Sequence, residues 1–323
     1  MSRPLISIIA PVYNEEATLD EFTQRIRTTL APLAQEYDYE IILVDDGSTD
    51  RSLEVMKRLA GGEERLLVIE LRRNYGQTAA LQAGLDVSNG DILVTLDADL
   101  QHFPEEIPAF LAKIKEGYDV VCGWRHQRAE TILRRWPSRM ANWMIRRIAR
   151  LEIHDFGTTF RAYRAEMIKE LRLFGEFHRY VPALTKDLGA RIAEIPIQNI
   201  TRPVGQSKYG IKRTMGVFLD LLVLFFFIRY MDRPMRAFGK LGLLAFAAGA
   251  GILAYLVIHS YVTGIPAVRE RQGWFLMSIM LLIASVQIFL TGILAEFLMR
   301  THYAYGDRRV YKVRSEYRKP AKA

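Results

Sequence analysis

Apolar and polar positions alternate in short blocks over the first 200 residues of the chain. Runs rich in Ile, Val and Leu predict buried strands at residues 5–12, 39–44, 66–71, 91–96 and 119–122, and a further strand-like run at 191–200. Helical spacing and capping residues predict helices that begin near residue 13, after residue 50, at 76–87 and at 104–116. Strands and helices that alternate at such short intervals are typical of a mostly parallel sheet with helices on both faces. The predicted fold class is therefore α/β.

The hydrophobic pattern changes after residue 210. Residues 241–258 and 273–295 contain no Asp, Glu, Lys or Arg, and they predict two transmembrane helices at about 241–261 and 274–298. The apolar segment 216–231 is interrupted by Asp220 and Arg229, so we expect an interfacial helix there. The predicted organisation is a soluble domain at 1–210, an interfacial region at 211–238, two membrane helices at 239–299 and a basic tail at 300–323.

Charge is concentrated beside the predicted membrane helices. The net charge is +8, and the tail from Arg300 to Ala323 holds eight Lys or Arg against Asp307 and Glu316. By the positive-inside rule, the soluble domain and the C-terminus both face the cytoplasm, and the basic tail attracts anionic lipid. Most of the net basic charge lies beside a predicted membrane helix, whereas a nucleic-acid partner would call for basic residues interleaved with aromatic ones on the soluble domain, so no nucleic-acid partner is expected. The single cysteine, Cys122, excludes an intramolecular disulfide and predicts a packed thiol in a reducing compartment.

Acidic residues stand at the ends of several predicted strands. Asp97 and Asp99 follow the strand at 91–96, and Asp45 and Asp46 follow the strand at 39–44. Ligands of open α/β sheets bind at these strand ends, and two aspartates one residue apart suit a divalent cation that also holds phosphate oxygens. Turn and capping chemistry is the alternative explanation for each cluster. No Gly-x-Gly-x-x-Gly and no Walker loop is present, which argues against a dinucleotide dehydrogenase and a phosphate-loop NTPase.

Three further segments carry candidate binding residues. The segment 126–154 predicts a basic amphipathic helix that lies either on a membrane surface or against the domain. Residues 155–164 alternate as a strand does. The loop 202–210 contains Arg202, Ser207 and Lys208, which suit a diphosphate, although a surface linker explains the same composition.

Six motifs occur in an order that resembles family 2 glycosyltransferases of the polyisoprenyl-phosphate type. They are PVYNEE at 11–16, VDDGSTD at 44–50, RNYGQ at 73–77, LDADLQ at 96–101, FRAYR at 160–164 and GQSKYG at 205–210. This group includes dolichol-phosphate mannose synthase, bactoprenol glucosyltransferases and the undecaprenyl-phosphate aminoarabinose transferase. The resemblance covers residues 5–210, and the two predicted spans fit the bacterial members, so a bacterial inner membrane is expected.

The resemblance implies a GT-A fold and an inverting transfer of a sugar from a nucleotide diphosphate sugar to a polyprenyl phosphate. The implied nucleotide-sugar site comprises Pro11, Tyr13, Glu15, Asp45, Asp46, Asp97, Arg202, Ser207 and Lys208. Asp97, Asp99 and Gln101 would hold Mg²⁺ or Mn²⁺, and Arg125 and Arg139 would meet the acceptor phosphate. Asp155 occupies the position of an acidic residue near the reaction centre. A homo-oligomer is also implied, because relatives form tetramers.

The chemistry of the reaction agrees with these assignments. A metal and fixed cations stabilise the charge that develops on the leaving diphosphate, a role in which Asp99 takes part. The acceptor phosphate is already ionised, so Asp155 is predicted to orient the sugar or the acceptor, with proton removal as the alternative. In-line attack would give a β-linked product from an α-linked donor. A UDP-sugar is the favoured donor and GDP-mannose the alternative; RNYGQ and FRAYR point toward aminoarabinose, but the sugar stays open.

Two rival functions make different demands on the same residues. A processive polysaccharide synthase would carry a Gln-x-x-Arg-Trp motif, whereas Ile132 stands at the glutamine position before Arg135 and Trp136. A catalytically idle membrane scaffold would not need to retain Asp97, Asp99, Gln101 and Lys208.

Overall fold

The computed structural model of the chain divides into two compact units. One unit comprises Met1–Leu222 with Arg309–Ala323, and the other comprises Val223–Arg308. The structure describes residues 3–126, 151–173, 175, 177–198, 200, 234–266, 269, 271–305 and 310–319, without the side chains of 234 and 299–305. The predicted interfacial helix at 216–231 and the predicted basic helix within 126–154 therefore lie outside the described residues, apart from the ends of the latter.

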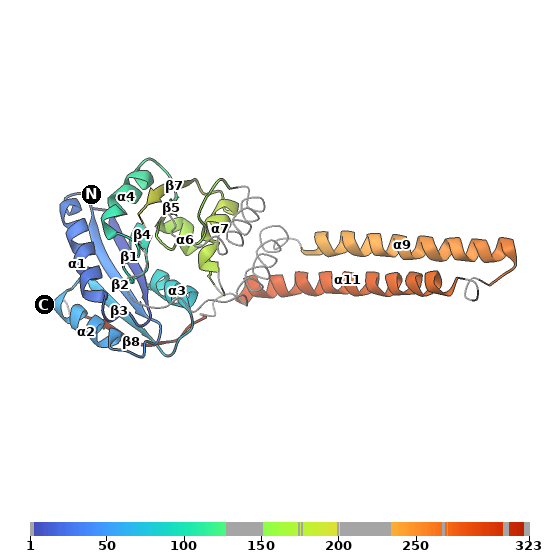
Figure 1. The fold of residues 1–323 in the computed structure, drawn as a ribbon, viewed down its shortest axis with the longest axis horizontal. Coiled ribbons are helices and arrows are strands. Elements are labelled where there is room, and N and C mark those ends of the chain that lie inside the picture. The colour runs from blue at the N-terminus through green and yellow to red at the C-terminus, as the bar shows by residue number, and fades with distance from the viewer. Residues whose placement is uncertain are drawn as a thin grey trace. The chain divides into compact units, whose positions relative to one another are not determined.

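The first unit is built on an eight-stranded sheet with the order β7-β5-β6-β4-β1-β2-β3-β8 (Figure 1). Its strands are β1 (Leu5–Val12), β2 (Asp38–Asp45), β3 (Leu66–Leu71), β4 (Ile92–Thr95), β5 (Val120–Arg125), β6 (Arg161–Arg164), β7 (Ile192–Ile197) and β8 (Val313–Arg318). The neighbours β4, β1, β2 and β3 run parallel, whereas β6 is antiparallel to β4 and β5. The carboxyl ends of β1, β2 and β4 therefore meet at one edge of the sheet.

Helices connect these strands and cover the sheet. They are α1 (Leu19–Leu30), α2 (Ser52–Gly62), α3 (Gln77–Val87), α4 (Ile107–Lys115), α6 (Ala165–Lys169) and α7 (Val181–Asp187), with 3₁₀ turns η1 (Ala31–Leu33), η2 (Pro104–Glu106) and η3 (Phe177–Arg179). The α/β prediction is confirmed. The predicted strands and the helices at 76–87 and 104–116 all appear, with the latter divided into η2 and α4.

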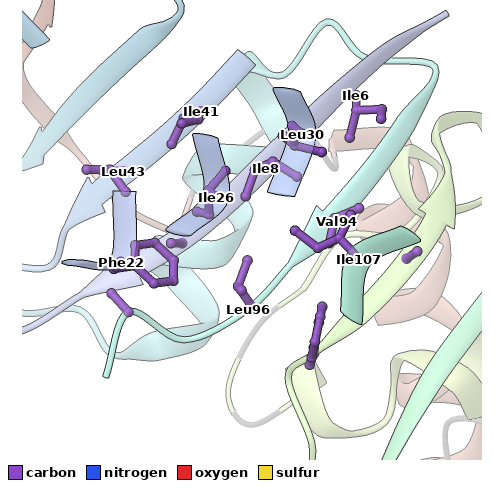
Figure 2. Close-up of a cluster of buried hydrophobic side chains, with 14 of the residues drawn as sticks. Ile6, Ile8, Phe22, Ile26, Leu30, Ile41, Leu43, Val94, Leu96 and Ile107 are labelled. Atoms are coloured by element: carbon purple, nitrogen blue, oxygen red, sulfur yellow. The ribbon is translucent and has the colours of Figure 1, made fainter. Parts of the chain in front are cut away.

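The strands bury different side chains on their two faces. Figure 2 shows Phe22, Ile26 and Leu30 of α1 beside Ile8 of β1 and Leu43 of β2. The next residue of β1, Ile9, points to the opposite face, because successive side chains of a strand alternate. There, a Cβ on Gly84 of α3 would lie 2.4 Å from Ile9 Cγ2, so α3 can approach the sheet only because Gly84 lacks a side chain. Cys122 is also buried, as predicted, and burial raises the pKa of its thiol to about 12.

Two elements differ from the sequence-based expectation. The first helix begins at Leu19 rather than near residue 13, because Asn14 has a φ of 58° and its Oδ1 accepts a hydrogen bond from Thr49 N at 2.8 Å. The predicted strand at 155–164 is reduced to Arg161–Arg164. Residues before it form a loop, in which Asp155 Oδ1 accepts a hydrogen bond from Gly157 N at 3.0 Å.

The C-terminal tail contains a strand, β8, that the sequence analysis did not predict. It pairs antiparallel with β3 and forms one edge of the sheet. The buried Glu70 of β3 accepts hydrogen bonds from Arg314 Nη1 at 3.0 Å and from the Tyr317 hydroxyl at 2.8 Å. Both ends of the chain therefore belong to the same unit, and the segment between them leaves that unit and returns to it.

The second unit contains two long apolar helices, α9 (Pro234–Thr263) and α11 (Gln272–Tyr305), which lie side by side (Figure 1). Glycines permit their close approach: a Cβ on Gly249 would lie 3.0 Å from Ser278 O, and one on Gly292 would lie 2.7 Å from Phe238 Cβ. Large apolar side chains such as Leu243, Leu244 and Ile258 are exposed. By length and composition, Met235–Thr263 and Gln272–Leu298 are candidate membrane spans, and they include both predicted spans.

Candidate functional site

Asp46 fixes the loop that leads into α3. It follows β2, and its carboxylate accepts hydrogen bonds from Tyr75 N at 2.7 Å and Gly76 N at 2.9 Å. Burial raises the pKa of Asp46, and the hydrogen bonds from these amides offset only part of that effect. The motif VDDGSTD therefore sets the position of the motif RNYGQ.

Asp45 is held within its own turn. It is only 2% exposed, and its Oδ1 accepts a hydrogen bond from Ser48 N at 3.1 Å. Burial raises the pKa of Asp45, although the Ser48 hydrogen bonds oppose the shift. Gly47 has a φ of 71°, and a Cβ there would lie 2.6 Å from Arg73 C, so only glycine fits this contact.

The first motif, PVYNEE, packs against the same turn. Asn14 N donates to Ser48 Oγ at 3.1 Å, and Glu15 N donates to Ser52 Oγ at 2.8 Å. Tyr13 is 47% exposed, whereas Pro11 and Glu15 are half-buried. The structure thus brings Pro11, Tyr13 and Glu15 beside Asp45 and Asp46, as the prediction required, while their contacts with a nucleotide stay predictions.

Asp97 is held by donors from two other segments. Its Oδ1 accepts a hydrogen bond from Gln77 Nε2 and its Oδ2 one from Thr159 Oγ1, both at 2.7 Å. A third segment reaches the next residue, since Thr18 Oγ1 donates to Ala98 O at 2.8 Å. The half-buried carboxylate is therefore fixed at the carboxyl edge of the sheet.

Asp99 and Gln101 complete a tight turn after Asp97. Asp99 Oδ1 accepts a hydrogen bond from Gln101 N at 3.1 Å, and Leu100 between them has a φ of 56°. A leucine in the left-handed region is strained, and such strain is concentrated at functional sites. Gln101 O accepts a hydrogen bond from Ile200 N at 3.2 Å, so the turn contacts the chain just before the predicted 202–210 loop.

The donor chemistry of this turn fits a hard divalent cation. Mg²⁺ is usually held by one or two carboxylates together with substrate phosphate oxygens. Asp97 and Asp99 supply two carboxylates, and a carboxylate, with about four lone-pair sites, can accept hydrogen bonds such as those from Gln77 and Thr159 and bind a metal at the same time. Among the described residues, no group of three or more His, Cys, Asp or Glu gathers. The predicted ligand set is two carboxylates with Gln101, and phosphate oxygens of the substrate would add to it.

Asp155 and Arg125, predicted for separate roles, form one ion pair. Arg125 Nε donates to Asp155 Oδ2 at 2.6 Å, and Arg125 Nη2 donates to Asp155 Oδ1 at 3.0 Å. Glu194 Oε1 of β7 accepts hydrogen bonds from the backbone N of His154 and of Asp155. In this structure the Arg125 guanidinium is therefore paired with Asp155, and its contact with an acceptor phosphate stays a prediction.

Four predicted residues lie outside the described part of the chain: Arg139, Arg202, Ser207 and Lys208. Conversely, the sequence analysis did not name Gln77 and Thr159 as site residues. Gln77 is the last residue of the motif RNYGQ, and Thr159 directly precedes the motif FRAYR, so their place in or beside named motifs was the available signal.

Comparison with known families and proteins identifies relatives over almost the whole chain. Residues 7–172 match the model of glycosyl transferase family 2, and residues 233–300 match the GtrB C-terminal hairpin. A dodecaprenyl-phosphate galacturonate synthase from Rhizobium johnstonii is 39% identical, over 92% of this chain and 88% of that protein. An undecaprenyl-phosphate 4-deoxy-4-formamido-L-arabinose transferase from Pseudomonas aeruginosa is 35% identical, over 92% and 86% respectively.

Solved structures with low sequence identity share the fold. A mannosyltransferase from Pyrobaculum calidifontis in complex with GDP-Man and Mn²⁺ has a TM-score of 0.51 at 20% identity, over 90% of this chain and 88% of that one. Glucosyl-3-phosphoglycerate synthase from Mycobacterium tuberculosis, in complex with Mn²⁺, uridine diphosphate and glucosyl-3-phosphoglycerate, has a TM-score of 0.51 at 20% identity, over 70% and 80%. The predicted GT-A fold is confirmed.

Proposed function

The chain belongs to glycosyl transferase family 2, and from this premise we propose that it transfers a sugar from a nucleotide diphosphate sugar to the phosphate of a membrane polyprenol. The names of the two relatives support this choice of acceptor, since both are polyprenyl-phosphate enzymes whose likeness covers 92% of this chain. The observation that carries the proposal is the fixed Asp97–Gln101 turn, which accepts hydrogen bonds from the loop after β1, from the first residue of α3 and from the loop before β6.

The donor side of the site is assigned to the carboxyl ends of β1, β2 and β4. The loops with Tyr13 and with Asp45 and Asp46 would bind the nucleotide, and Asp97, Asp99 and Gln101 would hold Mg²⁺ or Mn²⁺. The metal, when bound, would neutralise the charge that develops on the departing diphosphate. Arg202, Ser207 and Lys208 would close over the same diphosphate, because guanidinium and ammonium groups are strong phosphate donors.

On the acceptor side, the Arg125–Asp155 pair orients rather than deprotonates. A polyprenyl phosphate is ionised at neutral pH, so alignment behind the anomeric carbon contributes more than proton removal. Asp155 is 3% exposed and already paired, which suits a fixed orienting group better than a mobile base. Arg139 would add a second cation for the acceptor phosphate. In-line attack would invert the anomeric centre and give a β-linked product from an α-linked donor.

The helices α9 and α11 would hold the enzyme at the membrane where the acceptor resides. Both chain termini lie in the same unit, which agrees with an even number of spans between them. Basic residues before α9 and in the tail would place that unit in the cytoplasm, at a bacterial inner membrane. The relatives differ in the sugar they are named for, so a UDP-linked galacturonate joins the 4-aminoarabinose derivatives as a candidate donor.

The experiment is a product assay with the purified full-length protein in detergent. Undecaprenyl phosphate and Mg²⁺ are supplied with UDP-glucose, UDP-galacturonate, UDP-4-deoxy-4-formamido-L-arabinose or GDP-mannose, each alone, and the lipid fraction is analysed by mass spectrometry. We expect one UDP-sugar to yield a lipid phosphate heavier by one sugar residue. Nucleotide release without any lipid-linked sugar would contradict the proposed acceptor.

A further inference from the structure

Arg161, the first residue of β6, is a buried cation with an unusual set of partners. It is only 1% exposed, and its Nη1 donates to His178 O at 2.7 Å. Its Nη2 donates to Phe156 O at 2.8 Å and Arg179 O at 3.2 Å. Its Nε is buried and makes no hydrogen bond to the described part of the chain. Burying a guanidinium whose partners are neutral carbonyl oxygens costs free energy, so we expect its contacts to serve a specific role.

One arm of this arrangement reaches Asp97 through the loop before β6. Arg161 binds the carbonyl of Phe156 within that loop, and Arg161 itself directly follows the loop as the first residue of β6. Thr159 lies between these two anchors and donates to Asp97 Oδ2. The guanidinium thus joins Phe156 to Arg161 across the loop, and this restricts the direction of the Thr159 hydroxyl.

The other arm reaches Asp97 through η3 and α3. Arg161 binds the carbonyls of His178 and Arg179, and the His178 ring Nδ1 lies 2.6 Å from Thr78 Oγ1. The residue before Thr78 is Gln77, whose amide donates to Asp97 Oδ1. Burial, with the nearby charges of Arg179 and Arg161, lowers the pKa of His178 to about 3, so the ring stays neutral and shares one hydrogen with Thr78.

The two arms form a closed ring, which we call the Arg161 ring and define as Asp97, Gln77, Thr78, His178, Arg161 and Thr159. We propose that Arg161 is a positioning residue for metal binding: through this ring it holds the donors Gln77 and Thr159 on opposite oxygens of the Asp97 carboxylate, and so sets the affinity of the site for a divalent cation bound with a nucleoside diphosphate. The inference rests on the proposed function, since it takes Asp97 as a metal ligand.

The physical reason is the orientation of the carboxylate. A half-buried carboxylate that accepts a hydrogen bond on each of its oxygens cannot rotate freely, so the direction from which it can bind a metal is fixed. Groups that orient metal ligands in this way typically contribute roughly 10- to 100-fold to metal affinity. Weakening any link of the Arg161 ring should therefore weaken metal binding without removing a ligand.

The test uses the full-length protein and a pair of variants at Thr78. Thr78→Val keeps the shape of the side chain but loses the hydroxyl that meets His178, whereas Thr78→Ser retains a hydroxyl. Binding of Mn²⁺ in the presence of UDP is followed by electron paramagnetic resonance, and binding of UDP without metal by calorimetry. We expect Thr78→Val to raise the Mn²⁺ dissociation constant roughly tenfold, with metal-free UDP binding unchanged, and Thr78→Ser to bind Mn²⁺ as the wild type does.

A second pair of variants tests the guanidinium itself. Arg161→Lys keeps the charge but lacks the fork that joins three carbonyls, so we expect the Mn²⁺ dissociation constant to rise at least as much as for Thr78→Val. Arg164→Lys is the matched control, because Arg164 lies in the same strand but contacts Ile114 O and Asp119, outside the Arg161 ring. If Arg161→Lys does not fold, the Thr78 pair decides the question alone.

The outcomes separate this inference from the proposed function. Wild-type Mn²⁺ affinity in folded Thr78→Val would overturn the inference while leaving the metal site in place. A wild-type protein that binds UDP with no dependence on Mn²⁺, and in which Asp99→Asn changes nothing, would contradict the proposed function and this inference with it.

Discussion

Arg125 and Asp155 form a two-point ion pair, with Arg125 Nε 2.6 Å from Asp155 Oδ2 and Arg125 Nη2 3.0 Å from Asp155 Oδ1. Arg125 ends β5, and Asp155 lies in the loop before β6, so the pair joins two segments that are 30 residues apart in the sequence. Parallel hydrogen bonds between guanidinium and carboxylate fix direction as well as distance. The two residues should therefore be regarded as one functional unit.

Because of this pair, mutations of Arg125 and Asp155 should have strongly non-additive effects on the free energy of unfolding. Arg125→Gln removes the guanidinium that pairs with the almost fully buried Asp155 carboxylate, and we expect the free energy of unfolding to fall by about 3–5 kcal/mol. Arg125→Gln combined with Asp155→Asn removes both charges of the pair, so the double variant should be more stable than the sum of the single effects predicts. Denaturant unfolding of the four proteins in detergent measures the coupling. Additive effects would show that the pair does not act as a unit.

The stability of the protein should depend on both carboxylate oxygens of Asp46. Asp46→Asn can accept from only one of Tyr75 N and Gly76 N, and its new amide would face the other, so we expect a loss of about 1–3 kcal/mol in the free energy of unfolding. Asp20→Asn is the control, because Asp20 is exposed and its ion pair with Arg58 lies on the surface. Thermal unfolding of both variants gives the comparison, and equal small losses would refute the role given to Asp46.

His178 should make stability fall in acid. Its folded pKa is about 3, because burial and then the charges of Arg179 and Arg161 disfavour the cation, whereas an unfolded histidine titrates near 6.5. Between pH 7 and pH 5, His178 therefore gains a proton in the unfolded chain but not in the folded chain. This difference lowers the free energy of unfolding by about 2 kcal/mol.

The variant His178→Asn keeps a polar atom near Thr78 and removes this titration. The difference in unfolding free energy between wild type and variant should therefore shrink by about 2 kcal/mol from pH 7 to pH 5. Unfolding measured at both pH values provides the readout. A difference that does not change with pH would show that the ring is already protonated or accessible in the folded state.

Because β8 pairs with β3, we predict that the C-terminal tail stabilises the catalytic unit. Burial opposes ionisation of Glu70, but hydrogen bonds from Tyr317 and Arg314, with the charge of Lys57, lower the pKa of its carboxyl. Tyr317→Phe removes one donor from this buried carboxylate and should lower the free energy of unfolding by about 1.5–3 kcal/mol. Glu316→Gln, on the exposed face of β8, is the control and should change it by less than about 0.5 kcal/mol.

Much of the fold could be predicted because its signals are local. The strands β1, β2 and β3 are continuous apolar runs, and the predicted ends lie within a residue of those observed. The acidic turns after β2 and β4 could also be assigned to one edge, since parallel strands place their carboxyl ends together. For the same reason Asp45, Asp46, Asp97 and Asp99 were predicted as neighbours at one site.

Other features depend on partners far along the chain. In β8, Val313, Ser315 and Tyr317 alternate with charged residues, but the strand forms because β3 offers an edge more than 240 residues earlier. Residues 155–160 alternate like a strand and yet form a loop, because Asp155 binds Gly157 N and Arg125. The donors on Asp97 are neutral side chains, Gln77 and Thr159, whose role appears only when the fold brings them together.

The most direct measurement is the metal-dependent formation of lipid-linked sugar by two aspartate variants. Asp99→Asn alters a predicted metal ligand, whereas Asp91→Asn alters an exposed aspartate at the other end of β4, whose Oδ2 accepts a hydrogen bond from Leu5 N. With undecaprenyl phosphate, the productive nucleotide sugar and Mg²⁺, we expect Asp99→Asn to lower kcat by roughly 100-fold or more and Asp91→Asn to retain wild-type turnover. Equal turnover by both variants, or wild-type turnover that persists when all divalent metal is chelated, would contradict the account.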